Sequence, residues 1–549
     1  MSKTVIQHVL SRLSDIGIRD VFGVAGDFAF PISDAVCSDA AFRWIGCCNE
    51  LNAAYAADGY ARIQGIAALS TTYGVGELSA INGIAGSYAE HVTIFHLVGM
   101  PASGVQGGRR LVHHTLGNGE FGLFCKMAEP VVCAHAIMTP ENCIAETERL
   151  IAAARYHRRP VYIGIPADYA NLPVIGVTAS LAERSADEIT VKAAVDAIVA
   201  AVARSKTACI VPGILVSRCG LSEQATAVVD ASGLPFATMF MDKCVLDEMH
   251  PNYVGMYDRK LMNEEVRAFV EGCDCIIAIG AMLTDFNSGS FTAEIDRFRS
   301  INIMHNSVRV GDTVYNSIEM QDVLVALAKV IPRKHVPAPK ANGLGQPIGV
   351  PENKITVEYL YPRWQQMLKP DDILVAETGT TSMGLGLAQM PAGSTFQNQT
   401  LWASIGWATP AAFGAALAAP HRRAILITGE GSHQLTAQEV GQFHRFGLKP
   451  IIFVLNNNGY LIERLLCEDP ETCYNDLAQW HYDKLPEALG CEGWFTARVK
   501  TCDELDKAIR KAESCGTGAY IEVVVDKYAA SEVAWRLHDS TESLYASQS

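Results

Sequence analysis

The sequence predicts an α/β protein made of three doubly wound domains, each built on a mostly parallel β-sheet. Apolar strands alternate with amphipathic helices along the whole chain, which is typical of a sheet covered by helices on both faces. The chain of 549 residues is also too long for a single hydrophobic core. A segment rich in Pro, Gly and Lys at 332–351 interrupts the alternation. We therefore expect domains at 1–180, 187–336 and 352–549.

Charge and composition exclude two classes of partner. A formal net charge of -15 leaves no basic surface to neutralise phosphates, so a nucleic-acid partner is not expected. Apolar runs such as 411–419 are short and end in Pro-His-Arg-Arg, so a membrane role is not expected either. The content of 49% hydrophobic and 19% charged residues is that of a well-buried enzyme.

The amino terminus predicts an amphipathic helix, because Val5, Val9, Leu10, Leu13 and Ile16 share one helical face. Such a helix is not a signal peptide, so a cytoplasmic location is expected. The 16 cysteines are then interpreted as reduced thiols, since their spacing fits no zinc site.

Candidate polar residues follow the strands of the first region. We expect its strands at 20–24, 67–72, 92–98 and 161–165. Asp27 follows the first strand, Glu50 opens a helix, and a Gly-rich turn begins at Thr72. Taken alone, Glu50 is more simply an acid in the first turn of a helix. None of the turns fits G-x-G-x-x-G, so a nicotinamide or flavin dinucleotide site has no support.

His113 and His114 lie between glycines, in or beside a loop. Adjacent histidines usually occupy a polar surface loop. Two imidazoles in the same region as two candidate acids are nevertheless a plausible proton-handling cluster.

The middle region repeats the α/β alternation, with strands expected at 208–211 and 275–279. Its turns carry no comparable set of acids and amides. We interpret it as a structural or regulatory domain.

The last region, with strands expected at 373–376, 424–428, 451–455 and 520–525, contains the most informative motif. Gly429-Glu430-Gly431 follows one strand, and an asparagine-rich turn ending at Gly459 follows the next. The carboxyl ends of parallel strands meet at one edge of a sheet, so Glu430 and the turn should lie together. Carboxylate, amide and backbone oxygens suit Mg²⁺, and the glycines and helix amides suit a phosphate. A magnesium diphosphate is the expected ligand.

This segment resembles the thiamine diphosphate motif of the 2-keto acid decarboxylases, usually Gly-Asp-Gly followed one crossover later by Asn-Asn. The resemblance extends over essentially the whole chain. The sequence departs from the pattern at Glu430, where Asp is typical. It implies non-oxidative decarboxylation of a 2-keto acid to an aldehyde and CO₂, with thiamine diphosphate and Mg²⁺ as cofactors.

The resemblance also assigns roles to individual residues. It makes Glu50 the glutamate that acts on the aminopyrimidine ring, and we expect this carboxyl in an apolar site. It places Asp27, His113, His114 and Glu463 at the reacting carbons, with Asp27 and Glu463 sharing protons. The metal ligands would be Glu430, Asn457 and Gly459. The other cofactor contacts would be Thr72, Thr378, Ala403, Ile405, Gly429, Gly431, Ser432, His433 and Tyr460.

Partner and substrate follow from the same resemblance. The amino-terminal domain of one subunit and the carboxy-terminal domain of another would hold the cofactor together, so at least a homodimer is implied, and a homotetramer is suggested. The substrate pocket would comprise Phe286, Ser382, Ile462 and Trp535. Ser382 replaces a large aromatic residue of pyruvate-specific relatives and favours indolyl, phenyl or branched substrates, whereas Phe286 favours pyruvate.

Three alternatives remain open at this point. An acetolactate synthase-like carboligase would keep the cofactor, although such relatives normally lack the adjacent histidines. A dinucleotide-dependent oxidoreductase would use similar sheets. A catalytically inactive scaffold gains some weight from Glu430.

Overall fold

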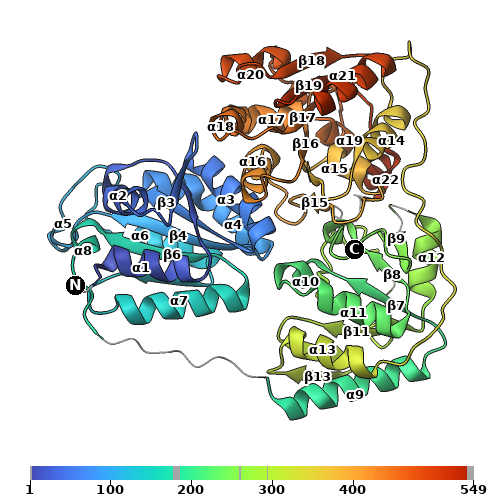
Figure 1. The fold of residues 1–549 in the computed structure, drawn as a ribbon, viewed down its shortest axis with the longest axis horizontal. Coiled ribbons are helices and arrows are strands. Elements are labelled where there is room, and N and C mark those ends of the chain that lie inside the picture. The colour runs from blue at the N-terminus through green and yellow to red at the C-terminus, as the bar shows by residue number, and fades with distance from the viewer. Residues whose placement is uncertain (1–2, 177–185, 259–260, 262, 293–294, 541–549) are drawn as a thin grey trace.

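The computed structural model describes residues 3–176, 186–258, 261, 263–292 and 295–540. It contains three β-sheets, each with helices around it (Figure 1). The expected domain ranges reach residues 1–2, 177–180 and 541–549, which lie outside the described part.

The first sheet has six parallel strands in the order β2-β1-β3-β4-β6-β5. Its strands are β1 (Asp20–Gly23), β2 (Arg43–Gly46), β3 (Ile66–Thr72), β4 (Thr93–Met100), β5 (Ala134–Ile137) and β6 (Val161–Pro166). Its helices are α1 (Val5–Asp15), α2 (Phe30–Ser38), α3 (Glu50–Gln64), α4 (Val75–Ala89), α5 (Ser103–Gly107), α6 (Leu123–Ala128), α7 (Cys143–His157) and α8 (Ala167–Ala170). β4 is buried along its whole length, as expected for a strand covered on both faces.

The middle sheet has seven strands in the order β13-β12-β11-β10-β7-β8-β9, in which β12 pairs antiparallel with both β11 and β13 and the other pairs are parallel. Its strands are β7 (Ala208–Pro212), β8 (Phe236–Thr238), β9 (Tyr253–Met256), β10 (Cys275–Ile279), β11 (Ser300–Ile303), β12 (Ser307–Val310) and β13 (Thr313–Asn316). Its helices are α9 (Glu188–Arg204), α10 (Ile214–Arg218), α11 (Ser222–Ser232), α12 (Glu264–Gly272) and α13 (Met320–Val330).

The third sheet has six parallel strands in the order β15-β14-β16-β17-β19-β18. Its strands are β14 (Ile373–Ala376), β15 (Thr395–Gln397), β16 (Ala424–Gly429), β17 (Ile451–Asn456), β18 (Phe495–Val499) and β19 (Ala519–Val524). Its helices are α14 (Val357–Met367), α15 (Thr380–Leu385), α16 (Ala408–Ala418), α17 (Glu430–Thr436), α18 (Val440–Arg445), α19 (Leu461–Leu466), α20 (Leu485–Ala488), α21 (Cys502–Ser514) and α22 (Glu532–Ser540). Numbered within its own domain, this sheet has the same strand order as the first.

The three doubly wound sheets confirm the predicted fold class. Sequence reasoning found the strongly apolar central strands but missed short ones such as β2, β8 and β15, which carry too few residues for a pattern. It also expected one helix after Gly431. The chain instead forms α17, a 3₁₀ turn (Ala437–Glu439) and α18.

The first and third domains pack through α3 and α16, which lie side by side at the centre of Figure 1. Two glycines permit the close approach: a Cβ at Gly59 would lie 2.1 Å from the Ala411 carbonyl oxygen, and one at Gly414 would lie 1.8 Å from that of Ala56. Within the described residues no helix is both long and apolar enough to span a bilayer.

The same interface contains a buried ionic network. Arg62 donates to Asp58 at 2.6 Å and to Glu90 at 2.7 Å, and the Trp407 indole donates to Asp58 at 2.9 Å. All three charged side chains are at most 1% exposed. Removing one partner would leave a buried charge unpaired, which is costly. This network therefore fixes how the first and third domains pack together.

Candidate functional site

The carboxyl ends of β16 and β17 bring the predicted metal ligands together. Gly429 is in register with Leu455, which places Glu430 beside the turn that follows β17. Glu430 Oε1 accepts the backbone N–H of Gly459 at 2.8 Å and that of Asn457 at 3.2 Å. The strand-end argument therefore predicted this neighbourhood correctly.

This edge of the sheet has the electrostatics of a ligand site. Glu430 is 3% exposed, and burial raises its pKa to about 7 although backbone amides lower it. The Asn457 Oδ1 atom is buried and has no hydrogen-bond partner. A buried acceptor without a donor is costly, and a cation would satisfy it. A Cβ at Gly429 would meet nothing within 4 Å, so there is open space beside the backbone. The donor set fits a magnesium diphosphate.

The helix after Gly429 carries three more of the predicted cofactor contacts, Gly431, Ser432 and His433, and their surroundings differ. A Cβ at Gly431 would lie 2.5 Å from the Tyr460 ring, so glycine is needed there for packing. Ser432 is buried. His433 is fully buried, with Nδ1 2.9 Å from the Thr409 hydroxyl and Nε2 2.9 Å from the Tyr520 hydroxyl.

The His433 side chain is therefore part of the core, in contrast with the role expected for it. Burial lowers its pKa to about 3, so the ring stays neutral. Both ring nitrogens are already engaged, which leaves only the backbone of this residue for a ligand.

Three predicted cofactor contacts lie on loops after β14 and β15. The Thr378 hydroxyl donates to the Gln399 carbonyl oxygen at 2.9 Å. Ala403 has a φ of 54°, a left-handed conformation that is uncommon for alanine and occurs at functional sites. Ile405 is only partly buried. It is thus not an ordinary core isoleucine.

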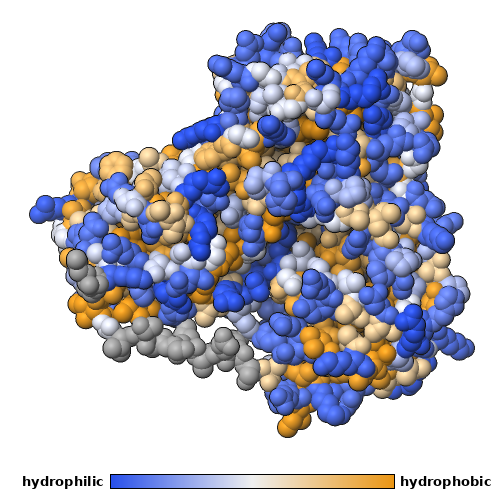
Figure 2. Space-filling model, in the orientation of Figure 1, coloured by the Kyte–Doolittle hydropathy of each residue, from blue (hydrophilic) through white to orange (hydrophobic). Residues whose placement is uncertain are grey.

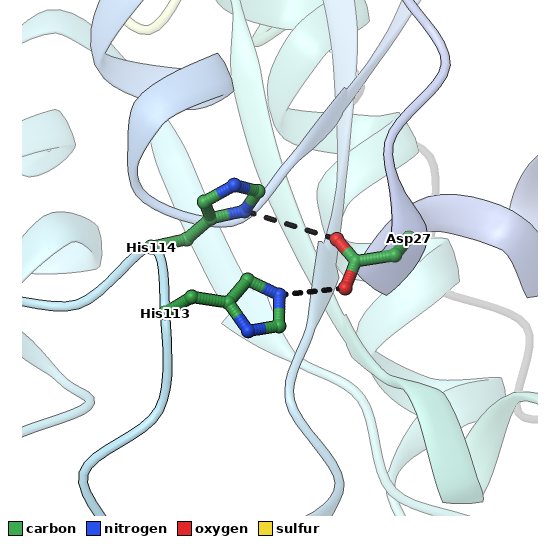
Figure 3. Close-up of side chains that lie close together, drawn as sticks. All are labelled: Asp27, His113 and His114. Atoms are coloured by element: carbon green, nitrogen blue, oxygen red, sulfur yellow. Dashed lines mark hydrogen bonds and ion pairs between the residues drawn. The ribbon is translucent and has the colours of Figure 1, made fainter.

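The amino-terminal domain brings Asp27, His113 and His114 together (Figure 3). His113 Nε2 lies 2.7 Å from Asp27 Oδ2, and His114 Nδ1 lies 3.8 Å from Asp27 Oδ1. Burial alone would raise the pKa of the Asp27 carboxyl, but the hydrogen bond with His113 and the nearby histidine charges outweigh it and lower the pKa. This carboxylate is kept ionised between two imidazoles.

Neighbouring aromatic and backbone groups hold the two histidine rings. Phe28 stacks on His113 with centroids 4.8 Å apart and meets His114 edge-on at 5.8 Å. His114 has a φ of 61°. Its carbonyl oxygen approaches Gly74 so closely that a Cβ there would lie 2.0 Å away. The turn after β3 therefore supports the histidine loop, and glycine is required at that contact.

Glu50 begins α3, on the same side of the domain as Thr72. A Cβ at Gly76 would lie 3.2 Å from Glu50 Oε1 and 3.1 Å from the Thr72 methyl group. Glu50 is partly exposed, so this chain by itself gives only part of the apolar site that we expected. The Thr72 hydroxyl is buried and without a hydrogen-bond partner.

The expected pairing of Asp27 with Glu463 is not present in the single chain. Asp27 follows the first sheet and is hydrogen-bonded to His113, whereas Glu463 lies on α19 of the third domain and is exposed. The two carboxylates belong to different sheets, so only a further assembly step could join them.

The four predicted pocket residues come from three helices and one loop, and two of them, Phe286 and Ile462, pack on the same cluster. Phe286 and Ile462 pack against a cluster that includes Met383 and Val533, and Phe286 stacks on Phe240 at 6.0 Å. Ser382, on α15, is buried, and its hydroxyl donates to the Gly379 carbonyl oxygen at 3.1 Å. Trp535, on α22, is 42% exposed. A separate cavity of about 520 Å³ between the middle and third domains is lined by none of these four.

Sequence reasoning missed two buried acids. Glu377 directly follows β14, is 1% exposed, and has its pKa raised to about 7 by burial. Glu439 accepts from the Asn52 amide at 2.7 Å and from the Cys48 N–H at 3.3 Å across the α3 interface. The strand-end rule could have found Glu377, which directly follows the predicted strand 373–376. Only the fold reveals Glu439.

Comparison with known proteins identifies the family. Three family models match: the amino-terminal thiamine pyrophosphate-binding domain at residues 3–119, the central domain of thiamine pyrophosphate enzymes at 195–328, and the carboxy-terminal thiamine pyrophosphate-binding domain at 375–523. The chain is 38% identical over 532 residues to the alpha-keto-acid decarboxylase of Mycobacterium leprae (strain TN), covering 95% of this chain and 93% of that protein.

Solved structures share the fold. Benzoylformate decarboxylase from Polynucleobacter necessarius has a TM-score of 0.79 at 19% identity, covering 96% of this chain and 99% of its own. The 4-hydroxybenzoylformate decarboxylase of Rhodococcus jostii RHA1 has a TM-score of 0.77 at 19% identity, covering 95% and 99%. The two sets of polar residues at the sheet edges agree with the three domain matches and with the 38% identity over 95% of the chain. Together they establish that the chain belongs to the thiamine diphosphate-dependent 2-keto acid decarboxylases.

Proposed function

We propose that this cytoplasmic decarboxylase converts a bulky or broad range of 2-keto acids to an aldehyde and CO₂, with Mg²⁺ anchoring the thiamine diphosphate. The observation that carries the magnesium assignment is the buried, unpartnered Asn457 Oδ1 beside the buried Glu430 carboxyl. None of the 16 cysteines is paired in a disulfide, which agrees with a reducing compartment.

The residues of the third domain hold the phosphate end. Glu430 and the Asn457 side chain supply two oxygen ligands, the Gly459 carbonyl supplies a third, and Gly429 leaves room for the diphosphate. Thiamine diphosphate, when bound, supplies the electron sink that cleavage of a 2-keto acid requires. Ile405 and the left-handed Ala403 shape the neighbouring wall.

The residues of the first domain manage protons. Glu50 would share a proton with the aminopyrimidine ring of the bound cofactor. Asp27 is ionised and hydrogen-bonded to His113, so it orients that imidazole, and His113 and His114 can each give or take a proton at the reacting carbon. The stacking of Phe28 on His113 limits movement of the ring.

The complete site requires a second copy of the chain. Among the described residues no hydrogen bond joins Asp27, Glu50 or the histidines to Glu430 or Asn457. Exposed apolar side chains flank both sets: Val75 is 55% exposed, Leu111 71% and Leu435 50%. On the face seen in Figure 2, hydrophobic patches also cover parts of the first domain. We propose a homodimer that buries such side chains, assembled further into a homotetramer.

Ser382 supports a bulky substrate. Serine is small and buried, and its neighbour Met383 belongs to the cluster against which Ile462 packs, so a large side chain at position 382 would occupy more of this region. The likeness to enzymes named for benzoylformate and 4-hydroxybenzoylformate agrees with aromatic 2-keto acids. The second candidate is pyruvate, which the stacked pair Phe286 and Phe240 favours by narrowing the same region. An acetolactate synthase-like carboligase is the third, and the adjacent histidines count against it.

A panel of 2-keto acids tests the proposal. Indolepyruvate, phenylpyruvate, benzoylformate, a branched-chain keto acid and pyruvate are compared by kcat/KM for release of CO₂ and aldehyde, with Mg²⁺ and thiamine diphosphate present. The expected result is a higher value for an aromatic or branched acid than for pyruvate. A preference for pyruvate would refute the substrate assignment, and acetolactate-type products in place of aldehyde would favour the carboligase.

A further inference from the structure

Asp27, His113 and His114 have the arrangement of a metal site. One ligand atom from each residue, two imidazole nitrogens and a carboxylate oxygen, lies within 4.8 Å of the other two. Figure 3 shows both rings turned toward the Asp27 carboxylate, with a dashed line from each ring to one of its oxygens. We propose that these three side chains bind a transition-metal ion of the Zn²⁺ class, and that this ion inhibits the enzyme reversibly.

The distances suit tetrahedral coordination. Ligand atoms around Zn²⁺ lie about 2.0–2.2 Å from the metal, which puts them about 3.3 Å from one another. His113 Nε2 is 2.7 Å from Asp27 Oδ2, and His114 Nδ1 is 3.8 Å from Asp27 Oδ1. These separations bracket the required value, although they run to two different oxygens of Asp27. Because all the ligand atoms lie within 4.8 Å of one another, side-chain adjustments of up to about 1.5 Å would bring both histidines to a shared ion.

One nitrogen makes no hydrogen bond, although it lies 3.8 Å from Asp27 Oδ1. The His114 Nδ1 atom is buried and has no hydrogen bond. It is held in place by the left-handed backbone of His114 and by Phe28, whose ring contacts both histidines. Such an atom gains a partner when a metal binds, and a preorganised ligand loses little entropy.

The ligand set selects the metal. Two imidazoles and one carboxylate favour Zn²⁺, Co²⁺ or Ni²⁺, whereas the oxygen-only set at Glu430 favours Mg²⁺. The Asp27 and His113 side chains are 41% and 60% exposed, so an ion can enter from solvent. Coordination through Nε2 uses the neutral tautomer of His113 that carries its proton on Nδ1, so the ion replaces the hydrogen bond between His113 and the ionised Asp27, and a water molecule completes the coordination.

The inhibitory effect rests on the proposed function, because the bound ion occupies the nitrogen lone pairs that would carry protons. Binding itself does not depend on the reaction. The two parts can therefore fail separately: a protein that binds the ion but decarboxylates nothing would refute only the function.

The test uses the full-length protein with Mg²⁺ and thiamine diphosphate in excess, so that the third-domain site is filled. Co²⁺ and Zn²⁺ are titrated and followed by calorimetry and by the visible absorption of Co²⁺. We expect one ion per chain with an absorption typical of nitrogen and oxygen ligands. Asp27→Asn and His114→Gln should each weaken binding at least tenfold. A thiolate-type Co²⁺ spectrum would place the ion on a cysteine and overturn the proposal.

The matched control is His135→Gln. His135 Nε2 lies 3.4 Å from Glu129 Oε1, so this exposed pair resembles His113 and Asp27 but lacks a second histidine among the described residues. It should leave Co²⁺ binding unchanged. Zn²⁺ should inhibit decarboxylation by the wild-type and control proteins, and a chelator should reverse the inhibition. Equal Co²⁺ affinity in the Asp27→Asn, His114→Gln and wild-type proteins would overturn the proposal.

Discussion

The substitution Glu430→Asp tests how the unusual glutamate is used. The shorter side chain withdraws the carboxylate by about 1.5 Å, one carbon–carbon bond. Glu430 Oε1 now accepts two amides, from Gly459 at 2.8 Å and Asn457 at 3.2 Å, and neither would remain within hydrogen-bonding distance. A buried amide left unpaired costs about 1–3 kcal/mol. The hydrogen bond from Asn457 is the longer of the two, and water can replace part of what is lost. We therefore expect the free energy of unfolding of the metal-free variant to be about 2 kcal/mol lower than that of the metal-free wild type.

The assay is denaturant unfolding of the metal-free and loaded proteins. When Mg²⁺ and thiamine diphosphate are present at a hundred times their Kd, their binding raises the free energy of unfolding by about 2.7 kcal/mol. In the motif that the sequence resembles, aspartate is typical at this position, so metal should stabilise the variant more than it stabilises the wild type. The exposed Glu492→Asp serves as control and should change stability by less than about 0.5 kcal/mol. Equal metal-free stability of Glu430→Asp and wild type would refute the structural reasoning, and an unchanged response to metal titration would show that residue 430 is not a ligand.

Three further predictions concern catalysis, specificity and pH. Glu50→Gln should fold normally and lose about a hundredfold or more in kcat, as removal of a proton-transfer group does; near-normal aldehyde formation would exclude Glu50 from the mechanism. Ser382→Trp should raise the kcat/KM ratio of pyruvate to indolepyruvate about tenfold or more, and an unchanged ratio would show that Ser382 does not line the pocket. Burial raises the pKa of Glu77 from 4.5 to about 7. Glu77 therefore contributes its full stabilisation below about pH 4.5, and the free energy of unfolding falls by up to about 3 kcal/mol as the pH rises through 7. Glu77→Gln keeps an oxygen acceptor for the Gly74 N–H and places an amide nitrogen that donates to the Tyr162 oxygen, and it should flatten this part of the pH–stability curve; an unaltered slope would contradict the assignment.

The sequence was sufficient for the fold class and for the two sets of strand-end residues. Both depend on local patterns: long apolar strands, and polar residues placed directly after them. Glu430 and the Asn457–Gly459 turn meet because parallel neighbouring strands bring their ends together, and Asp27 meets the turn at Thr72 for the same reason.

Other features depend on tertiary packing and have no local signal. His433 follows the glycine motif, yet the helix turns its ring into the core between Thr409 and Tyr520. The Asp58 and Arg62 network and the Glu439 contacts join segments more than 300 residues apart, as the bonds from Asp58 to Trp407 and from Asn52 to Glu439 illustrate. No pattern within a single helix or strand could predict them.

The central claim is that Glu50 of one chain and Asn457 of another form one catalytic site. Co-expression of Glu50→Gln with Asn457→Ala, each inactive alone, tests it by the rate of decarboxylation in the mixed preparation. If sites are shared between two subunits, half of the sites in each heterodimer are intact, and about a quarter of the wild-type activity should return. If each site were built within a single chain, every site would retain one defect and the mixture would remain inactive.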